Sequence, residues 1–482
     1  MHPGRAGSFN SPDSRIAPTP IGDGSLQYQL LLSLPDGSED MACAIIDPTE
    51  ELKEILASTA SQDIQVQGLV PAWLLKQMRK SNPNFIHTEL RTANRRVSET
   101  LSSFLKTNET LCLVKLPGAF LFIYFETQPP AALGQLAGYH VAALTTREVD
   151  SVSSKQDQLI LFAREVEKAL GITPDQFFSW SSGNTNQSQC QKSVCLMFDD
   201  KYDTERKLWS IYFDSIGATV FSYDMKGSWD LFCRGESGAI ISHPEFAMYS
   251  FIPDFGKQLM GRRNVFQLGY DFRQDGPDAR FEATQLFPYG TTVLMTDGIY
   301  IHHPKAALRI LEDINKHNAD KPPIVWTWRL AGRRGIKHWL MDLAVKYEHE
   351  LQAGDNTRFD LLNALLTLFL DEFMDEDDPQ HPRRNSPLIT MDELLMEDYT
   401  ELWKTEPQRA LERIVDWFAY TALTMRHVCR RFVVVHDGVV PGRWREKNQH
   451  VLFYTPEKYF ERFNVGDRRT GLIEKAVGEK SR

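Results

Sequence analysis

Several features that mark other protein classes are missing from this 482-residue chain. The longest uninterrupted apolar run, Ala119 to Phe125, has seven residues. A bilayer span needs about 20, so we expect no membrane crossing. The N-terminal stretch MHPGRAGSFNSPDSRIAPTP has no apolar segment of the kind that secretory signals require. We therefore expect residues 1–25 to form a disordered tail.

Cysteine is scarce and scattered. The six cysteines form no CxxC pair, which argues against both a disulfide framework and a structural zinc site. The group His427, Cys429 and His436 also lacks standard metal-ligand spacing. This usage favours a reducing compartment, either the cytosol or the nucleus.

Cofactor and nucleophile motifs are missing as well. Neither GxGxxG nor GxxxxGK[ST] occurs, and Gly332 and Gly335 in LAGRRG make only an incomplete match after a strand. The segment from Gly235 to Gly238 contains Ser237 but lacks the GxSxG spacing of a nucleophile elbow. We therefore expect no cofactor and no esterase-type chemistry.

What is present is an ordinary globular composition with one local charge feature. Hydrophobic residues make up 42%, aromatic residues 11% and charged residues 24%, so most of the chain should fold around cores. The net charge is −10, and the segment from Asp355 to Glu401 alone holds 13 acidic and 3 basic residues. The rest of the chain is nearly neutral, and its C-terminal end is basic. Global charge therefore excludes neither a nucleic-acid contact nor a histone contact.

The first half of the chain predicts a small α+β or β-barrel domain over residues 26–145. The runs LCLVKL and AFLFIYF flank Pro117-Gly118, which is turn chemistry between two strands and predicts a hairpin. Helices are expected at Pro48–Ala57, Pro71–Lys80 and Arg91–Leu105. Residues 146–206 read as a linker with one amphipathic helix at Leu159–Leu170.

The second half predicts a doubly wound parallel sheet over residues 207–352. Five runs rich in β-branched or aromatic residues alternate with helical segments, which is typical of such a sheet; the runs are TVFSYD, GAIISH, NVFQLGY, TTVLMTD and PIVWTW. An acidic helical insert follows over residues 353–402. Residues 403–482 are expected to hold a helix and a closing hairpin of RRFVVVH and HVLFYT around a basic loop.

Acidic residues at strand ends leave a metal-dependent nuclease open. Asp224 ends TVFSYD, Asp297 ends TTVLMTD, and Asp271 follows NVFQLGY. Two-metal nucleases collect such carboxylates at the carboxyl ends of parallel strands. Aspartate is also a common turn residue, and a complete acidic quartet cannot be assembled.

Basic residues interleaved with aromatic ones leave nucleic-acid binding open too, because they neutralise phosphates and stack on bases. The candidates fall in two stretches: Arg329, Arg333, Arg334 and Lys337, and Arg430, Arg431, Arg443 and Arg445. The simpler interpretation is that the neighbouring tryptophans lie in the core and the basic side chains flank them in solvent.

Three segments carry a family resemblance: SIYFDSIGATVFSYDMKGSWDLFC, FPYGTTVLMTDGIYIHHPKAALRIL, and RRFVVVHDG with NQHVLFYTPEKYF. They resemble the C-terminal half of filamentous-fungal chromodomain proteins. That half is similar in layout to the C-terminal region of the chromodomain subunit of the RNA-induced transcriptional silencing complex. The resemblance covers Leu208 to Val465, and it rests on topology alone over Leu26 to Leu144. It implies a SPOC-like barrel before a PIN-like domain without nuclease activity, whereas no chromodomain precedes Leu26.

From these observations we expect a nuclear, non-catalytic scaffold whose partners are chromatin-silencing proteins. The helices at Leu361–Phe373 and Met391–Leu402 are apolar on one face and acidic on the other, and are candidate docking elements. The alternatives are a metal-dependent nuclease using Asp224, Asp297 and Asp271, and a nucleic-acid-binding protein without catalysis.

Overall fold

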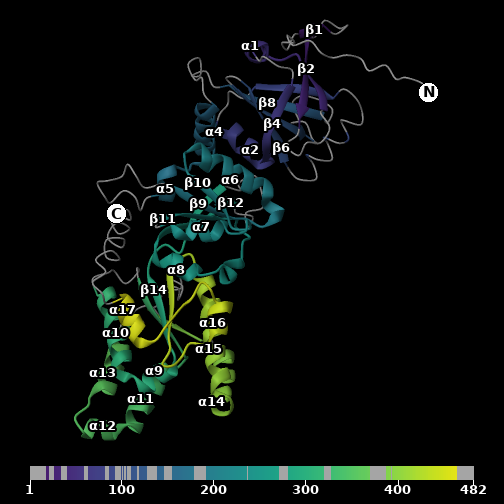
Figure 1. Cartoon of the computed structure of the whole chain (residues 1–482). Helices are drawn as coiled ribbons and strands as arrows, with labels where there is room; N and C mark the ends of the chain where they lie inside the picture. The colour runs from purple at the N-terminus through teal and green to yellow at the C-terminus, as the bar shows by residue number, and fades with distance from the viewer. Residues whose placement is uncertain are drawn as a thin grey trace, which may run out of the picture. The chain divides into compact units, whose positions relative to one another are not determined.

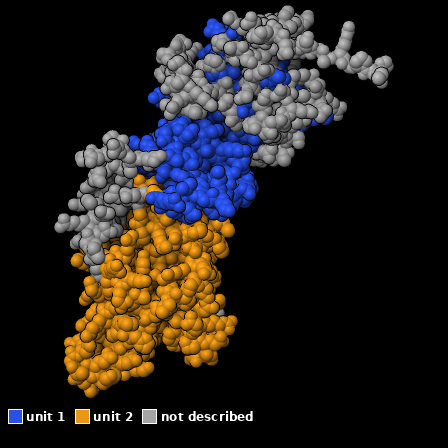
Figure 2. Space-filling model, viewed as in Figure 1, with its two compact units in different colours: residues 1–234, 241–243, 268–283 blue, residues 235–240, 244–267, 284–482 orange. Residues whose placement is uncertain are grey.

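The computed structural model describes residues 18–20, 26–33, 41–58, 63–81, 86–92, 99, 101, 105, 110–116, 119–126, 138–145, 155–178, 192–235, 237–270, 281–319, 327–369, 387–391 and 393–463. Figure 2 colours its two compact units. Unit 1 comprises Met1–Arg234, Ile241–His243 and Leu268–Ala283. Unit 2 comprises Gly235–Ile240, Pro244–Gln267 and Thr284–Arg482. None of the helices in the described ranges is long and apolar enough to span a bilayer.

Unit 1 contains a closed β-barrel. Its strands are β1 (Pro18–Pro20), β2 (Leu26–Ser33), β3 (Met41–Ile46), β4 (Asp63–Pro71), β5 (Ile86–Thr92), β6 (Thr110–Leu116), β7 (Ala119–Glu126) and β8 (Gly138–Thr145). They follow the order β1-β2-β3-β5-β8-β7-β6-β4, and β4 also pairs with β2 in parallel. That last pairing closes the sheet on itself. The prediction of a small α+β or barrel domain is confirmed at this level.

The predicted hairpin and two of the predicted helices are confirmed in this barrel. Strands β6 and β7 are antiparallel, with Leu116 opposite Ala119 across the Pro-Gly turn. Helix α1 (Glu50–Ser58) places Leu52 and Leu56 in the barrel core, and helix α2 (Ala72–Ser81) buries Leu74, Leu75 and Met78. Most of the helix expected over 91–105 lies outside the described residues, and β5 occupies its first two positions.

The predicted linker contains more regular structure than the sequence suggested. Helix α4 (Lys155–Leu170) includes the expected amphipathic helix, and α5 (Pro174–Phe178) follows it. Strand β9 (Ser193–Met197), a short 3-10 helix η3 (Asp200–Tyr202) and α6 (Asp203–Ser215) come next. The run SVCLM was not predicted as a strand, although its last four residues are buried.

Strand β9 belongs to a second sheet of five strands in the order β10-β9-β11-β12-β13. The others are β10 (Thr219–Ser222), β11 (Ser237–Ser242), β12 (Arg262–Tyr270) and β13 (Phe281–Leu286). Strand β10 runs parallel to β9, with Thr219 opposite Ser193. Between these strands lie α7 (Ser228–Arg234), the 3-10 helix η4 (Met248–Phe251) and α8 (Phe255–Met260).

Unit 2 contains a third sheet, in which every neighbouring pair of strands is parallel. Its strands are β14 (Thr291–Met295), β15 (Trp328–Gly332), β16 (Leu388–Thr390), β17 (Arg431–Val435) and β18 (Leu452–Tyr454). They follow the order β16-β15-β14-β17-β18. Strands β15 and β16 lie on one side of β14, and β17 and β18 lie on the other. When the strands are numbered from β14 in chain order, their order in the sheet is 3-2-1-4-5, which is typical of doubly wound sheets.

Helices cover both faces of this third sheet (Figure 1). The helices of this part of the chain are α9 (Asp297–His302), α10 (Pro304–Asn318), α11 (Ile336–Lys346), α12 (Glu348–Gln352), α13 (Thr357–Phe369), α14 (Glu393–Thr405), α15 (Pro407–Thr424), α16 (Gly442–Lys447) and α17 (Pro456–Phe463). Val433 faces the core that contains residues of α10, α13 and α17. Its neighbour Phe432 packs on Phe418 of α15 instead. This alternation follows from the period of two along a strand.

Two predictions about this region are wrong. Of the five runs assigned to one sheet over 207–352, TVFSYD, GAIISH and NVFQLGY coincide with β10, β11 and β12 of the second sheet, whereas TTVLMTD coincides with β14 of the third. Most of the fifth run, PIVWTW, lies outside the described residues, and β15 shares only Trp328 with it. The doubly wound parallel sheet draws its last three strands from beyond residue 387. The final pair is not a hairpin, because β17 and β18 are parallel, with Val433 opposite Leu452. A parallel pair needs a crossover connection, and the basic segment between them supplies it with α16.

Candidate functional site at the carboxyl edge of the parallel sheet

The order of the third sheet identifies one edge as its natural ligand-binding position. In doubly wound sheets, ligands bind outside the carboxyl ends of the strands, where the connections on the two sides of the first strand diverge. Here that point lies between β14 and β17, which are neighbours in the sheet. Strand β14 is followed by Thr296-Asp297-Gly298 and β17 by His436-Asp437-Gly438.

Asp297 is the central acidic residue of this edge. It ends the connection from β14, begins α9 and is buried, with 2% of its surface exposed. Its Oδ2 atom accepts hydrogen bonds from Nη1 of Arg333 at 3.0 Å and from the hydroxyl of Tyr399 at 2.8 Å. Burial raises the pKa of Asp297, and the charge of Arg333 and these two bonds act in the opposite direction. The Oδ2 atom of this carboxylate is thus already paired with two of the protein's own side chains.

Aromatic rings surround the Arg333 guanidinium. Arg333 lies in the turn between β15 and α11, and its side chain is 14% exposed. Its Cζ atom lies 4.9 Å from the ring centre of Trp339 and 5.6 Å from that of Tyr399. Tyr399 is fully buried on α14 and stacks on Trp403 at 5.9 Å. A cation over such rings is attracted by their negative faces.

The second half of the edge comes from the end of β17. His436 Nδ1 lies 3.2 Å from Oγ1 of Thr296 and 3.3 Å from Oδ1 of Asp437. Burial lowers the pKa of His436, and the charge of Asp437 opposes this shift. The imidazole is therefore neutral at neutral pH. Gly298 leaves room for Asp437, because a Cβ atom at residue 298 would lie 2.1 Å from Oδ2 of that carboxylate.

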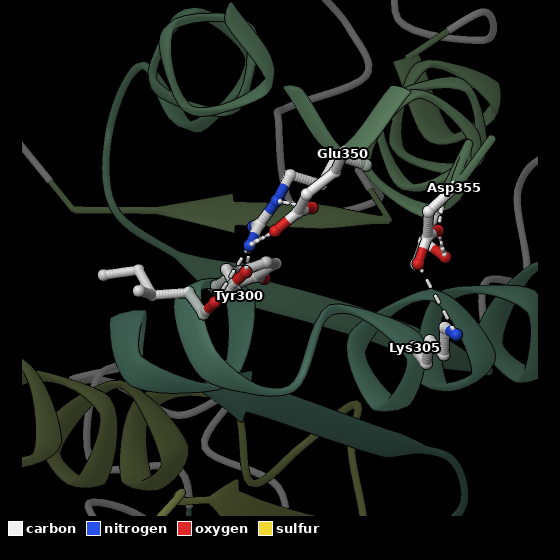
Figure 3. Close-up of polar contacts among 7 residues, drawn as sticks. Tyr300, Lys305, Glu350 and Asp355 are labelled. Carbon is white, nitrogen blue, oxygen red and sulfur yellow. Dashed lines mark hydrogen bonds and ion pairs between the residues drawn. The ribbon is translucent and has the colours of Figure 1, made fainter. Parts of the chain in front are cut away.

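The opposite end of α9 is held by Arg358, whose partners Tyr300 and Glu350 are labelled in Figure 3. Its guanidinium donates to the carbonyl oxygens of Tyr300 and Ile301 at 3.0 and 3.1 Å, and to Glu350 at 2.8 Å. A positive charge at the C-terminus of a helix is favourable. Helix α9 is thus fixed at its first residue by Arg333 and Tyr399 and at its last turn by Arg358.

A second ion pair shown in Figure 3 anchors the start of α13. Lys305 Nζ lies 3.5 Å from Oδ2 of Asp355. The other oxygen of Asp355 accepts hydrogen bonds from the backbone N–H of Thr357 at 3.0 Å and from its hydroxyl at 2.5 Å. Such side-chain acceptors satisfy the unpaired N–H groups at a helix start. These polar contacts orient helices, so we treat them as support for the site and not as part of it.

The structure does not bring together the three aspartates that the sequence indicated as nuclease candidates. Asp224 lies in unit 1 after β10, where Arg206 and Ser222 donate hydrogen bonds to it. Burial raises its pKa in part, but the bonds from Ser222 and Arg206 outweigh this effect and the net shift is downward. Asp297 belongs to unit 2, and Asp271 lies outside the described residues. Within the described ranges, no group of three or more His, Cys, Asp and Glu side chains could hold a metal ion.

Several basic candidates are not on the surface. Arg329, Arg430 and Arg431 are 4–6% exposed, so phosphate groups cannot reach them while unit 2 is folded. Arg430 donates to backbone carbonyl oxygens, including those of Leu259 and Arg263 at 2.8 and 2.6 Å. Burial lowers its pKa to about 9, which still leaves it charged at neutral pH.

The remaining basic candidates are at least partly exposed. Arg443 forms an ion pair with Glu412 of α15, and Lys447 from the same stretch pairs with Asp416 at 2.7 Å. Arg334 and Arg445 are exposed and Lys337 is half-buried. The positive charge of the segment between β17 and β18 is therefore largely balanced by α15, which weakens its attraction for phosphate.

The main residue that sequence reasoning missed is Tyr399. It lies 102 residues from Asp297, and nothing in its local pattern connects the two. A usable signal did exist for the edge itself, because both TTVLM and RFVVV are fully buried strands followed closely by Asp-Gly. Comparison of the chain with protein-family models and with curated proteins finds no match.

Proposed function

We propose that this protein is a non-catalytic scaffold that acts through protein contacts, in nuclear complexes that silence chromatin. The observation that carries the proposal is the neutralised acid: at the point where a metal-dependent enzyme of this topology needs an available carboxylate, Asp297 is buried and paired with Arg333 and Tyr399. A carboxylate held by a guanidinium in this way offers little attraction to a divalent cation.

The chromatin context and the SPOC-like and PIN-like descriptions rest on the resemblance of three segments to fungal chromodomain proteins. The closed barrel of unit 1 and the 3-2-1-4-5 sheet of unit 2 are compatible with them. The docking helix predicted over Leu361–Phe373 needs revision. Leu361, Leu365 and Leu368, which lie on α13 there, belong to the core of unit 2. Partner contacts through the apolar face of that helix are therefore excluded in the folded unit.

Two measurements on the full chain test this proposal. The first is cleavage of single-stranded RNA and duplex DNA with Mg²⁺ or Mn²⁺, comparing the wild-type chain with a doubly substituted Asp224→Asn, Asp297→Asn chain. We expect no difference between them; cleavage that the double substitution abolishes would establish the nuclease instead. The second is affinity purification from nuclear extract, in which recovery of metabolic enzymes without chromatin proteins would contradict the silencing role.

A further inference from the structure

Asp297, Trp339 and Tyr399 together have the composition of a cation-binding cage. A buried carboxylate supplies the counter-charge, and two aromatic rings supply the walls, which is the chemistry that proteins use to hold side-chain cations and quaternary ammonium groups. The three residues come from the ends of different elements: Asp297 begins α9, Trp339 lies on α11 and Tyr399 on α14. We call this set the cation cage.

The cage is occupied by the chain's own Arg333, and the fit is incomplete. Arg333 gives one hydrogen bond to Asp297, while its Nε atom is buried without a hydrogen-bond partner in the described part of the chain. The same holds for the hydroxyl of Tyr300. Tyr300 is buried and packs edge-on against Trp339, with ring centres 5.6 Å apart. Burial and the negative charge of Asp297 both raise the pKa of its hydroxyl. Buried polar groups without partners reduce stability, so a better-matched cation can compete with Arg333.

The position of Arg333 is suited to exchange. Its side chain is the partly exposed member of the pair, at 14% against 3% for Asp297. It lies in a turn between Gly332 and Gly335, and Gly335 has a left-handed backbone with open space where a side chain would point. Arg333 and Arg334, which would have to move to empty the cage, lie between the last residue of β15 and the N-terminal cap of α11.

We propose that the cation cage is a binding site for an arginine side chain of a partner protein, which replaces Arg333. Arginine is favoured over lysine because a planar guanidinium stacks on aromatic rings and presents several N–H donors to one carboxylate. The proposal deepens the scaffold function by naming the chemistry of a partner, and it rests on that function. Because Arg333 competes from within the chain, the wild-type protein should bind such a partner more weakly than a chain with an empty cage.

Chemical rescue tests the cage in the full chain. Arg333→Ala should lower the thermal midpoint of unfolding, and millimolar ethylguanidinium should raise the midpoint of this variant again. The wild-type chain and Arg333→Met should not respond, because their cages are filled by Arg333 itself or by an apolar side chain of similar length. Arg333→Ala combined with Asp297→Asn should also not respond. Equal responses in all four chains would overturn the cage.

Peptide binding tests the partner chemistry. A five-residue peptide with one central arginine should bind the Arg333→Ala chain at least about tenfold more tightly than it binds the wild-type chain. The fluorescence of Trp339 and its neighbours measures this binding. The same peptide with citrulline, a neutral isostere, should bind neither. Equal binding of both peptides, or of one peptide to both chains, contradicts the proposal. If Arg333→Ala does not fold alone, refolding yield with each peptide is the readout. Peptide binding without recovery of chromatin partners would refute the proposed function and leave the cage intact.

Discussion

The Asp297 carboxylate and the Arg333 guanidinium lie 3.0 Å apart although 36 residues separate them in the chain. They meet because β14 and β15 are parallel neighbours, with Leu294 opposite Ala331, and each residue follows its own strand by one or two positions. Parallel strands bring their carboxyl ends to the same edge. The pair is therefore a product of topology, and it neutralises Asp297 at the edge where this type of sheet binds ligands.

Removing one member of this pair should be costly. Arg333→Met leaves a buried carboxylate without its counter-charge, which typically costs about 3–5 kcal/mol of stability. Combining Arg333→Met with Asp297→Asn should cost clearly less than the sum of the single changes, since no uncompensated charge remains. The unfolding free energies of the four chains in urea, monitored through hydrogen exchange of the amides in β14 and β15, measure this coupling. Additive losses would show that the two residues do not interact.

Tyr399→Phe should weaken the attachment of α14. The substitution removes only the hydroxyl that donates to Asp297 at 2.8 Å, and a hydrogen bond to a charged group contributes about 1.5–3 kcal/mol. Amides of α14 should then exchange faster, while those of the barrel in unit 1 stay unchanged. Tyr420→Phe is the matched control, because Tyr420 on the neighbouring helix is 71% exposed. Similar exchange rates of the α14 amides in both variants would show that the hydrogen bond from Tyr399 to Asp297 does not hold this helix.

Two glycines with almost the same backbone angle should respond differently to alanine. Gly290 has φ +87° and a Cβ atom there would lie 2.4 Å from the carbonyl oxygen of Thr327, whereas Gly354 has φ +85° and open space around it. Gly354→Ala should cost about 1 kcal/mol from backbone conformation alone. Gly290→Ala should cost several times more, because the backbone before β14 must move. Equal unfolding midpoints would contradict this close approach.

Acidification should destabilise the chain through His450. This histidine is buried, its Nε2–H donates to the carbonyl oxygen of Ala419 at 2.9 Å, and burial lowers its pKa to about 4. The unfolded chain, with a pKa of about 6.5, then binds more protons between pH 6.5 and 4. Up to about 3 kcal/mol of stability is lost as the pH falls through this window.

The pH dependence has a matched comparison in His450→Gln, which carries no titrating group at this position. Its unfolding free energy should fall less steeply between pH 6.5 and 4 than that of the wild-type chain. His338→Gln, at an exposed position on α11, should leave the slope as it is in the wild type. A wild-type slope in His450→Gln would mean that other groups cause the acid sensitivity.

Arg358→Met should loosen the helices of unit 2. The change leaves the carbonyl oxygens of Tyr300 and Ile301 without this donor and Glu350 without its ion pair. We expect a loss of about 3 kcal/mol, since each buried group left unsatisfied costs about 1–3 kcal/mol. Arg409→Met is the control, because the Arg409 side chain is 67% exposed and pairs with Glu406 on the surface. Thermal unfolding distinguishes the two variants. A similar midpoint for both would show that the contacts of Arg358 with α9 and Glu350 contribute little to stability.

Local patterns determined many of the helices and strands of this protein, although they did not reveal β9. The Pro-Gly turn between two β-rich runs sufficed for the β6–β7 hairpin, and the acidic-led segment before Leu52 sufficed for α1. Hydrophobic periodicity and turn chemistry are read from neighbouring residues, so such elements follow from sequence alone. The buried run before Asp297 also indicated that this residue closely follows a strand, which ends at Met295, and Asp297 itself begins α9.

Tertiary structure alone decided which strands share a sheet and which side chains share a site. The segment RRFVVVH could pair with HVLFYT in either direction as far as its composition shows, and the crossover through α16 made the pair parallel. Tyr399, 102 residues from Asp297, reaches it only because α14 returns to the carboxyl edge of the sheet. Pairing between distant segments depends on the whole chain's packing and not on local propensity. For that reason, the sequence left Asp297 open as a catalytic acid, and the fold gave it Arg333 and Tyr399 as partners.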